Sequence, residues 1–509
     1  MTLSILIWLP LVISLLAALV PRAWTGRAAA AGSLLTLAVA ISFLARFKLG
    51  HAGLQFVTDK VWISALGIHY KLGLDGLNVG LVVLCAVLFS ASLAWAALRE
   101  PDRPRARVFY FHFGLAQSAV LGAFCAQDLA LFVGFFDLML IPFYFLTGMW
   151  GSGERVRATT KLVIYTLVGS FFMLVAAIAT GVLASSQHGT QLTFVISTLQ
   201  QLPLSKSSQE WIFLCFAVAF LVKMPLVPFH GWLPDGYKSM PIPAVAVFSG
   251  IVSKVAAYGF LRIVLPLFPA ASVHFQTLML LIALLSILWA TALAFTTPDA
   301  RLVVAYSSVA QLGFITLGIF SLRPEGGQGA LLQMINHGLV TAPLFFVVAA
   351  LAIRSGGSES LPKMGGIAFR APVLASLFLI VALATLAIPG SSNFIGEFMI
   401  LLGVFKAQLA IAVIAFAGVI GAAVYALRVF IGAMHNRGGK DVASREIIVA
   451  EAVAIVPLIG VILVLALYPQ FALRRSEPSL KGAIAPAQAA QVSAGVGVVS
   501  YAPPAGGAP

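Results

Sequence analysis

The chain has 509 residues, of which 61% are apolar and 9% charged, and its formal net charge is +14. Soluble globular proteins carry charge on about a quarter of their residues, so this composition indicates a membrane protein and argues against several soluble domains. The basic residues stand singly between apolar runs and form no basic stripe, which argues against a nucleic-acid partner.

Motifs for metals, disulfides and nucleotides are missing from the sequence. Cys85, Cys125 and Cys215 lie alone in apolar segments, a pattern that excludes a disulfide framework, an iron–sulfur set or a structural zinc site within this chain. No GxGxxG follows a predicted strand, and no GxxxxGK[ST] occurs. We therefore expect this chain to bind no metal and no cofactor.

Apolar runs long enough to span a bilayer, about 20 residues each, recur along the chain. They predict an all-α polytopic membrane protein of about fourteen transmembrane helices, near residues 3–20, 28–46, 75–97, 108–125, 128–148, 158–183, 211–229, 244–266, 274–297, 301–321, 328–353, 370–403, 408–434 and 446–468. The first run follows no basic segment and precedes no clear cleavage site, so we expect a retained helix and not a signal peptide.

Two segments are expected outside the spanning helices. Polar and apolar residues alternate between Gln55 and Gly73, which predicts a small extramembrane hairpin. The segment 477–509 is rich in Ala, Pro and Gly, and we expect it to be a disordered tail.

The distribution of Lys and Arg among the loops predicts the orientation in the membrane. Alternate loops, beginning with the first, hold 17 of the 31 basic residues, against 10 on the opposite side with the tail. Because cytoplasmic loops carry the excess of positive charge, both termini are expected to be extracytoplasmic, in a bacterial-type inner membrane.

Four ionisable residues lie inside the apolar runs. Lys254 is the eleventh residue of a 23-residue run, too deep for its side chain to reach the membrane surface, and Lys223, Asp137 and Glu397 also lie within runs. Two acids and two lysines in the interior are typical of a proton relay. A structural salt bridge between helices is the alternative, and for Lys223 a second alternative is a side chain that extends to the membrane surface.

Two runs contain helix-breaking residues beside an ionisable one. Pro225 and Pro228 follow Lys223, and Pro389 and Gly390 precede Glu397. Broken helices at corresponding places in two halves are typical of inverted repeats, so we expect helices 7 and 12 to be broken and helices 4–8 to repeat as helices 9–13.

This expectation divides the chain into five parts. The predicted units are N-terminal helices 1–3 with the hairpin, the first repeat, the second repeat, the C-terminal helix and the tail, at residues 1–107, 108–268, 269–435, 436–476 and 477–509.

Two histidines are candidates for relay or gating. His230 follows the first break in PFHGWLPD, and His337 lies in the eleventh run in QMINHGL. Histidine titrates near neutral pH and can pass a proton between neighbours. A hydrogen bond across a helix interface explains His337 equally well, and capping or gating is the alternative for His230.

These motifs resemble the antiporter-like membrane subunits of respiratory complex I. The similarity runs through LGLDGLN, IPFYFLTGMWG, VKMPLVPFHGWLPD, AYSSVAQLGF, QGALLQMINHGL and IPGSSNFIGEF, in consistent order along almost the whole chain. The resemblance implies a fourteen-helix proton-translocating subunit in an assembly that oxidises NADH and reduces a quinone. It also implies that the proton path falls on Asp137, Lys223, Lys254 and Glu397.

The same resemblance implies the partners. Neighbouring antiporter-like subunits and the hydrophilic redox arm are expected beside this chain in the lipid bilayer, and NADH, flavin, iron–sulfur clusters and quinone are expected in those partners. Three positions depart from the family pattern: Asp137 replaces a Glu, Gln311 replaces a His, and Tyr237 to Ser239 replace a His and an acid.

Three other functions fit the same residues. A subunit of a multi-chain sodium/proton antiporter has the same fold and exchanges ions without electron transfer, and a membrane-bound hydrogenase subunit is a second possibility. A structural scaffold, in which the buried charges only fix the positions of helices, is the third.

Overall fold

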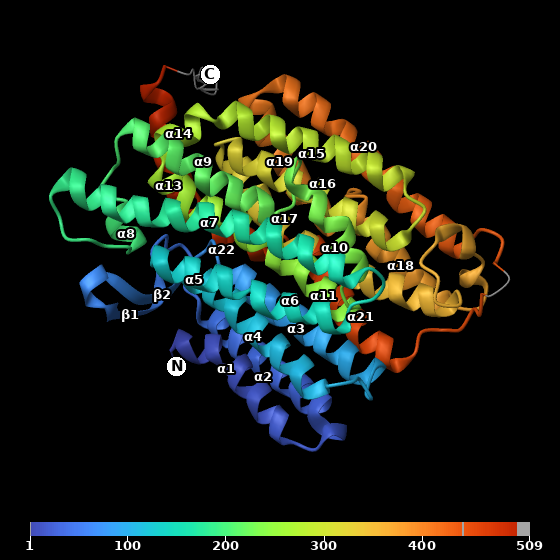
Figure 1. The fold of residues 1–509 in the computed structure, drawn as a ribbon. Helices are drawn as coiled ribbons and strands as arrows, with labels where there is room; N and C mark the ends of the chain where they lie inside the picture. Colours follow the sequence, from blue (N-terminus) through green and yellow to red (C-terminus); the bar gives the residue numbers. More distant parts are fainter. Residues whose placement is uncertain (1, 440–441, 496–509) are drawn as a thin grey trace, which may run out of the picture.

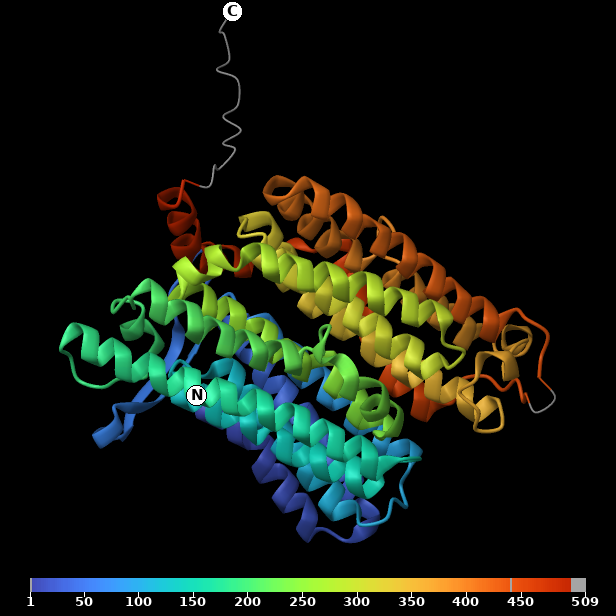
Figure 2. The same cartoon turned by 45° about the horizontal axis from the view of Figure 1, so that its top comes forward.

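The computed structural model describes residues 2–439 and 442–495, which form a bundle of roughly parallel helices (Figure 1). The two views place the N-terminal helices on one side of the bundle and α20 on the opposite side (Figure 2). The N-terminal part contains α1 (Leu3–Leu19), α2 (Arg22–Arg46), strands β1 (Gln55–Ile63) and β2 (Ile68–Leu74), and α3 (Val79–Arg99).

The central part of the chain contains long helices and several short ones. It comprises α4 (Ala106–Cys125), α5 (Leu129–Leu138), α6 (Leu140–Trp150), α7 (Arg155–His188), α8 (Ile196–Leu199), α9 (Lys206–Lys223), η2 (Phe229–Trp232) and α10 (Leu233–Ser239). A continuous helical rod of changing pitch follows, made of α11 (Ile242–Val247), η3 (Phe248–Val252), α12 (Ser253–Gly259), η4 (Phe260–Val264) and α13 (Leu265–Leu267).

The last part of the chain contains the helices of the second half. They are α14 (Pro269–His274), α15 (Gln276–Thr296), α16 (Ala300–Phe320), α17 (Pro324–Arg354), α18 (Pro372–Thr385), α19 (Ser392–Ala407), α20 (Leu409–Met434), α21 (Val449–Leu467) and α22 (Gln470–Ser493).

Eleven helical segments in the described residues are long and apolar enough to cross a membrane. Each lies on one of the predicted apolar runs, so the expected multi-pass all-α fold is confirmed. The rod Ile242–Leu267 and helix α17 are buried almost throughout, whereas α7 and α20 expose many apolar side chains. The rod and α17 therefore form the centre of the bundle, and α7 and α20 its periphery.

The strands expected between Gln55 and Gly73 pair as a hairpin. Strand β1 pairs with β2 in antiparallel register, with Thr58 opposite Leu72 and Lys60 opposite Tyr70. In the hairpin, Asp59 accepts contacts from His69 (2.7 Å) and Lys71 (3.0 Å). Partial burial alone would raise the pKa of Asp59, but the hydrogen bonds from His69 and Lys71 lower it below its usual value.

The expectation of a disordered tail is wrong for residues 477–493. These residues continue α22, which begins at Gln470 and includes Pro478 and Pro486 within its length. Leu480, Ile484 and Ala487 on one face of α22 are buried, and the helix packs against α13, α14 and α17. Packing of this apolar face outweighs a composition that is typical of disorder. Residues 496–509 lie outside the described residues.

Candidate functional site

Lys254 lies on α12 in the centre of the bundle, and its side chain is completely buried. Its ammonium donates to the carbonyl oxygen of Ser249 and lies 3.4 Å from the hydroxyl of Ser253. Ser249 belongs to the π-helical segment η3, and its carbonyl also accepts a hydrogen bond of 3.1 Å from the Ser253 hydroxyl. The short π-helical segment thus provides an acceptor for a charge far from bulk water.

Lys223 is the last residue of α9, and only 4% of it is exposed. Its ammonium lies 4.9 Å from the ring centroid of Phe136, the neighbour of Asp137 on α5. The half-buried carboxylate of Asp137 lies within electrostatic reach of Lys223 without forming a direct ion pair, and its buried Oδ1 atom has no hydrogen-bond partner in the described residues. The structure therefore brings Asp137 and Lys223 together from two helices that are far apart in the sequence.

The first break follows Lys223 directly. Residues 224–228 are not helical, Pro225 is buried and Pro228 is exposed, and the Val227–Pro228 peptide bond is cis. The backbone groups that the break releases find protein partners: the Val227 amide donates to the Ser286 hydroxyl (3.0 Å), and the Trp232 indole donates to the Val222 carbonyl (3.0 Å). Such pairing is what allows non-helical backbone inside a membrane domain.

His230 lies just beyond this break, in η2, and is half-buried. Its Nε2 atom accepts a hydrogen bond of 3.2 Å from the indole of Trp289 on α15. It lies at the end of the first break, and its buried Nδ1 atom has no hydrogen-bond partner among the described residues.

Glu397 lies on α19 and is 2% exposed. Its Oε1 atom accepts a hydrogen bond of 2.7 Å from Gln311 on α16, and Gln333 on α17 donates to the same atom at 3.4 Å. Gln333 also donates to the Gln311 carbonyl at 2.7 Å. A Cβ on Gly396 would lie 2.3 Å from the Gln333 side-chain oxygen, so a larger residue there would displace this amide. The acid is thus held by two amides from two other helices.

The second break separates α18 from α19. Pro389 and Gly390 are exposed within it, and Gly390 has φ +93°, a conformation that requires glycine. Asn336 on α17 donates to the Ser392 carbonyl at 2.6 Å and so binds the first residue of α19. The break is therefore anchored to α17.

His337 is one turn from Gln333 on α17, is buried, and lies within electrostatic reach of Lys254. Helix α17 approaches η3 closely at this point: a Cβ on Gly338 would lie 2.5 Å from the Gly250 carbonyl oxygen. Neither ring nitrogen of His337 has a hydrogen-bond partner among the described residues.

A row of polar groups leads from Lys254 toward Glu397, but it does not extend to Lys223. From Lys254, contacts continue through Ser249, whose hydroxyl lies 3.0 Å from that of Ser308 on α16, and Gln311 follows one turn along the same helix. Between Lys223 and Lys254, the described residues provide no direct hydrogen bond.

Ion pairs fix α10, the helix that follows the first break. Lys161 of α7 pairs with Asp235 on α10, and Lys238 on α10 contacts Asp299 and Glu359. These contacts hold the segment that follows the first break.

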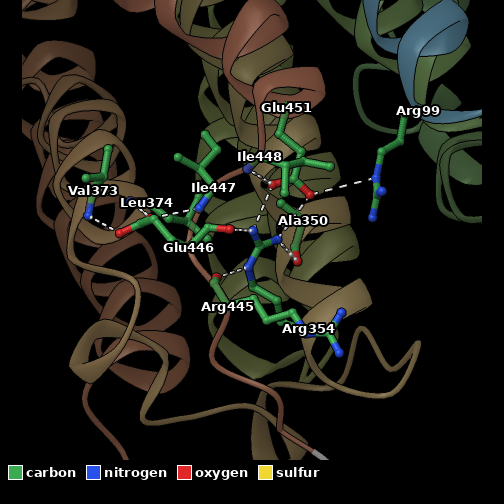
Figure 3. Close-up of polar contacts among 10 residues, drawn as sticks. All are labelled: Arg99, Ala350, Arg354, Val373, Leu374, Arg445, Glu446, Ile447, Ile448 and Glu451. Atoms are coloured by element: carbon green, nitrogen blue, oxygen red, sulfur yellow. Dashed lines mark hydrogen bonds and ion pairs between the residues drawn. The ribbon is translucent and has the colours of Figure 1, made fainter.

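A second cluster, drawn in Figure 3, holds the segment before the second break. Arg354 at the end of α17 forms a bidentate pair with Glu451 on α21 (3.1 and 2.8 Å), and Arg99 of α3 lies 3.8 Å from the same carboxylate. Glu446 accepts hydrogen bonds from the amides of Val373 (2.9 Å) and Leu374 (3.0 Å), which caps the N-terminus of α18. Although burial acts to raise it, the backbone hydrogen bonds lower the pKa of Glu446.

Comparison with known proteins identifies the family. A model of the membrane domain described as NADH:quinone oxidoreductase/Mrp antiporter matches residues 126–423, which is more than half of the chain. The chain belongs to this family. NADH-quinone oxidoreductase subunit M of Rhodobacter capsulatus is 34% identical over 496 residues, which cover 94% of this chain and 95% of that protein.

Two solved structures have the same fold as this family member. A chain of respiratory complex I from Thermus thermophilus matches with a TM-score of 0.87 and 31% identity, covering 96% of this chain and 100% of that one. A chain of the Mrp complex from Dietzia sp. DQ12-45-1b matches with a TM-score of 0.83 and 22% identity, covering 96% and 99%, and at this identity the likeness concerns the fold alone.

Proposed function

We propose that the chain is a proton-translocating membrane subunit of an NADH:quinone oxidoreductase of the complex I type, located in a bacterial inner membrane with both termini extracytoplasmic. The observation that carries the proposal is a relative named as such a subunit that shares 34% of residues over nearly the full length of both chains. The buried side chains of Lys223, Lys254 and Glu397, together with the half-buried Asp137, support the translocating role.

The proposal extends to the architecture. Helices α1, α9 and the α18–α19 pair join the eleven long apolar segments as spans, which gives fourteen. In this arrangement α4 to the rod Ile242–Leu267 form the first five-helix repeat, and α15 to α20 form the second. The breaks after Lys223 and before Glu397 then occupy corresponding positions in the two repeats.

The proposed route begins at Asp137 and Lys223. When the charge of Asp137 is withdrawn or neutralised, the ammonium of Lys223 loses its stabilising partner and gives up its proton more readily. The proton passes by water to Lys254 and His337, and then past Gln311 and Gln333 to Glu397. Water is the expected carrier because His337, Gln333 and Glu397 each keep a buried polar atom without a protein partner in the described part of the chain.

Energetics require the charges to act in series. One ion pair at an effective dielectric of about 20 contributes on the order of 2 kcal/mol at a separation of about 7 Å. Moving one proton against about 200 mV costs about 4.6 kcal/mol. Opening the Asp137–Lys223 pair alone is insufficient, so we propose that several charge changes along the route are coupled.

Redox chemistry belongs to the partners in this proposal. NADH, flavin, iron–sulfur clusters and quinone are bound by other subunits, and neighbouring antiporter-like subunits transmit the energy of quinone reduction to this chain. The surrounding lipid bilayer insulates the route.

Proton pumping by the assembled, reconstituted complex tests the proposal. Lys223→Ala and Glu397→Ala should each lower the acidification of the vesicle lumen per quinone reduced. Lys206→Ala and Glu210→Ala change the same residue types in a pair at the start of α9 and should leave it unchanged. Unchanged pumping in Lys223→Ala or Glu397→Ala would remove that residue from the route. Acidification driven by a sodium gradient without NADH would instead support an antiporter.

A further inference from the structure

A groove between α2, α3, α17 and α21 reaches the interior of the bundle from the periphery. The groove has a volume of about 110 Å³, and residues of α22 line part of it. Val83 and Val87 of α3, Ile335 and Leu339 of α17, and Val461 and Leu465 of α21 line it. The lining is almost wholly apolar, and apolar cavities of this order stay dry and bind apolar groups.

Ile335 marks the inner wall of the groove. Between Gly326 and Ala352 of α17 every residue is buried except Ile335, which is half-buried. The groove therefore opens a single window onto a central helix that is otherwise enclosed by protein along this stretch.

Gly80 keeps this window open. A Cβ at Gly80 would lie 2.7 Å from the Cδ1 atom of Ile335, so any side chain there would enter the groove. Gly76 has a related role at the rim, because a Cβ there would lie 2.2 Å from the Arg475 carbonyl oxygen. The two glycines allow α22 to approach α3 while the space in front of Ile335 stays unfilled.

Arg475 of α22 places a positive charge at the mouth. Its Nη1 atom donates to the Phe471 carbonyl at 2.6 Å, and its guanidinium lies 3.9 Å from the Phe471 ring centroid. Its buried Nε atom has no partner, and no carboxylate in the described residues pairs with it. The hydroxyl of Ser476, at the same rim, already donates its hydrogen to the Gln328 side-chain oxygen at 2.9 Å. Arg475 thus has donors free for an anion.

We infer that this groove binds one membrane phospholipid, with an acyl chain against Ile335 and the phosphate on Arg475. A deep apolar channel with a cation at its mouth matches the two chemical parts of such a lipid, and guanidinium groups bind phosphate well. The acyl chain packs on the outer face of α17, the helix that carries Gln333 and His337 toward the interior. The lipid is therefore an integral part of the wall behind the polar row.

Photolabelling locates the lipid directly. The assembled complex is reconstituted with a trace of phosphatidylglycerol that carries a diazirine in its acyl chain, and the labelled residues are mapped by mass spectrometry. Label at Ile335 is expected, together with label at Val464, which is exposed on the outer surface of α21. Label at Val464 without any at Ile335 would overturn the inference.

Variants test the two ends of the site. Gly80→Leu should abolish label at Ile335 and remove one bound phospholipid per copy of the chain in native mass spectrometry. Arg475→Gln should weaken retention of that lipid about tenfold, the loss expected for one hydrogen bond to a charged group. Arg474→Gln, at the exposed neighbouring position, is the matched control. An Arg475→Gln complex that retains its lipid as tightly as the control would contradict the phosphate contact, even if Gly80→Leu fails to assemble.

Discussion

Gln311 donates a hydrogen bond of 2.7 Å to Glu397, and its own carbonyl oxygen accepts one of 2.7 Å from Gln333. These two successive hydrogen bonds, from Gln333 to Gln311 and from Gln311 to Glu397, fix the orientation of both amides. Gln311 of α16, a side chain that does not titrate, therefore supports the carboxylate of Glu397 on α19.

This relationship predicts different results for two replacements of Gln311. Gln311→Leu removes a hydrogen bond to a buried acid, which costs on the order of 2 kcal/mol, and should lower NADH-driven pumping severalfold. Gln311→His restores a donor and should retain most of the activity. Pumping rates of the two assembled complexes in vesicles measure the effect, and equal rates would show that the donor at this position is irrelevant.

A second prediction concerns the charge of Asp137. Asp137→Asn removes the negative charge that interacts with Lys223 and should lower pumping roughly thirtyfold, since that attraction is worth on the order of 2 kcal/mol. Asp137→Glu keeps the charge and should be far less damaging. The comparison is made as protons moved per NADH oxidised, and equal activity of the two variants would argue against a role for the charge.

The buried pair of Arg354 and Glu451 predicts a loss of stability. Glu451→Gln leaves the Arg354 guanidinium buried without its anion, which costs about 3–5 kcal/mol. Thermal denaturation of the purified complex should begin at a lower temperature, and less assembled complex should be recovered from membranes. The double variant Arg354→Met with Glu451→Leu should recover part of the loss, because it removes both charges. A double variant less stable than Glu451→Gln would contradict this explanation.

Glu446 predicts a smaller and pH-dependent effect. Because the pKa of this carboxylate is lowered in the folded protein, its contribution to stability is present above the unfolded pKa of about 4.3 and is lost as the pH falls through the folded value. Glu446→Gln should therefore speed hydrogen exchange at Val373 and Leu374 at neutral pH. The difference from the wild type should shrink in acid, and a difference that grew in acid would contradict the capping role.

The spanning helices could be predicted from the sequence because apolar runs of the right length are a direct physical requirement of the bilayer. Lys223, Lys254 and Glu397 were detectable for the same reason, since a charge in such a run is costly. The seventh helix was expected to end near residue 229. In the structure α9 ends at Lys223, because the prolines that follow lack backbone donors.

Other features could not be predicted because they depend on contacts between distant segments. Gln333 is neutral and gave no signal until the structure placed it beside Glu397. The two π-helical segments of the rod carry no local motif, and the pairing of Arg354 with Glu451 joins residues 97 positions apart. The helix α22 was missed because its stability comes from a buried face and not from its composition.

In the proposed route, a proton crosses the membrane domain through the buried side chain of Lys254. The most direct measurement is NADH-driven proton uptake by vesicles that contain the assembled Lys254→Met complex, with Lys206→Met at an exposed position as control. A route through Lys254 predicts that the Lys254→Met complex assembles, as shown by bound partner subunits, but moves far fewer protons, while Lys206→Met pumps like the wild type. Wild-type pumping by an assembled Lys254→Met complex would contradict it.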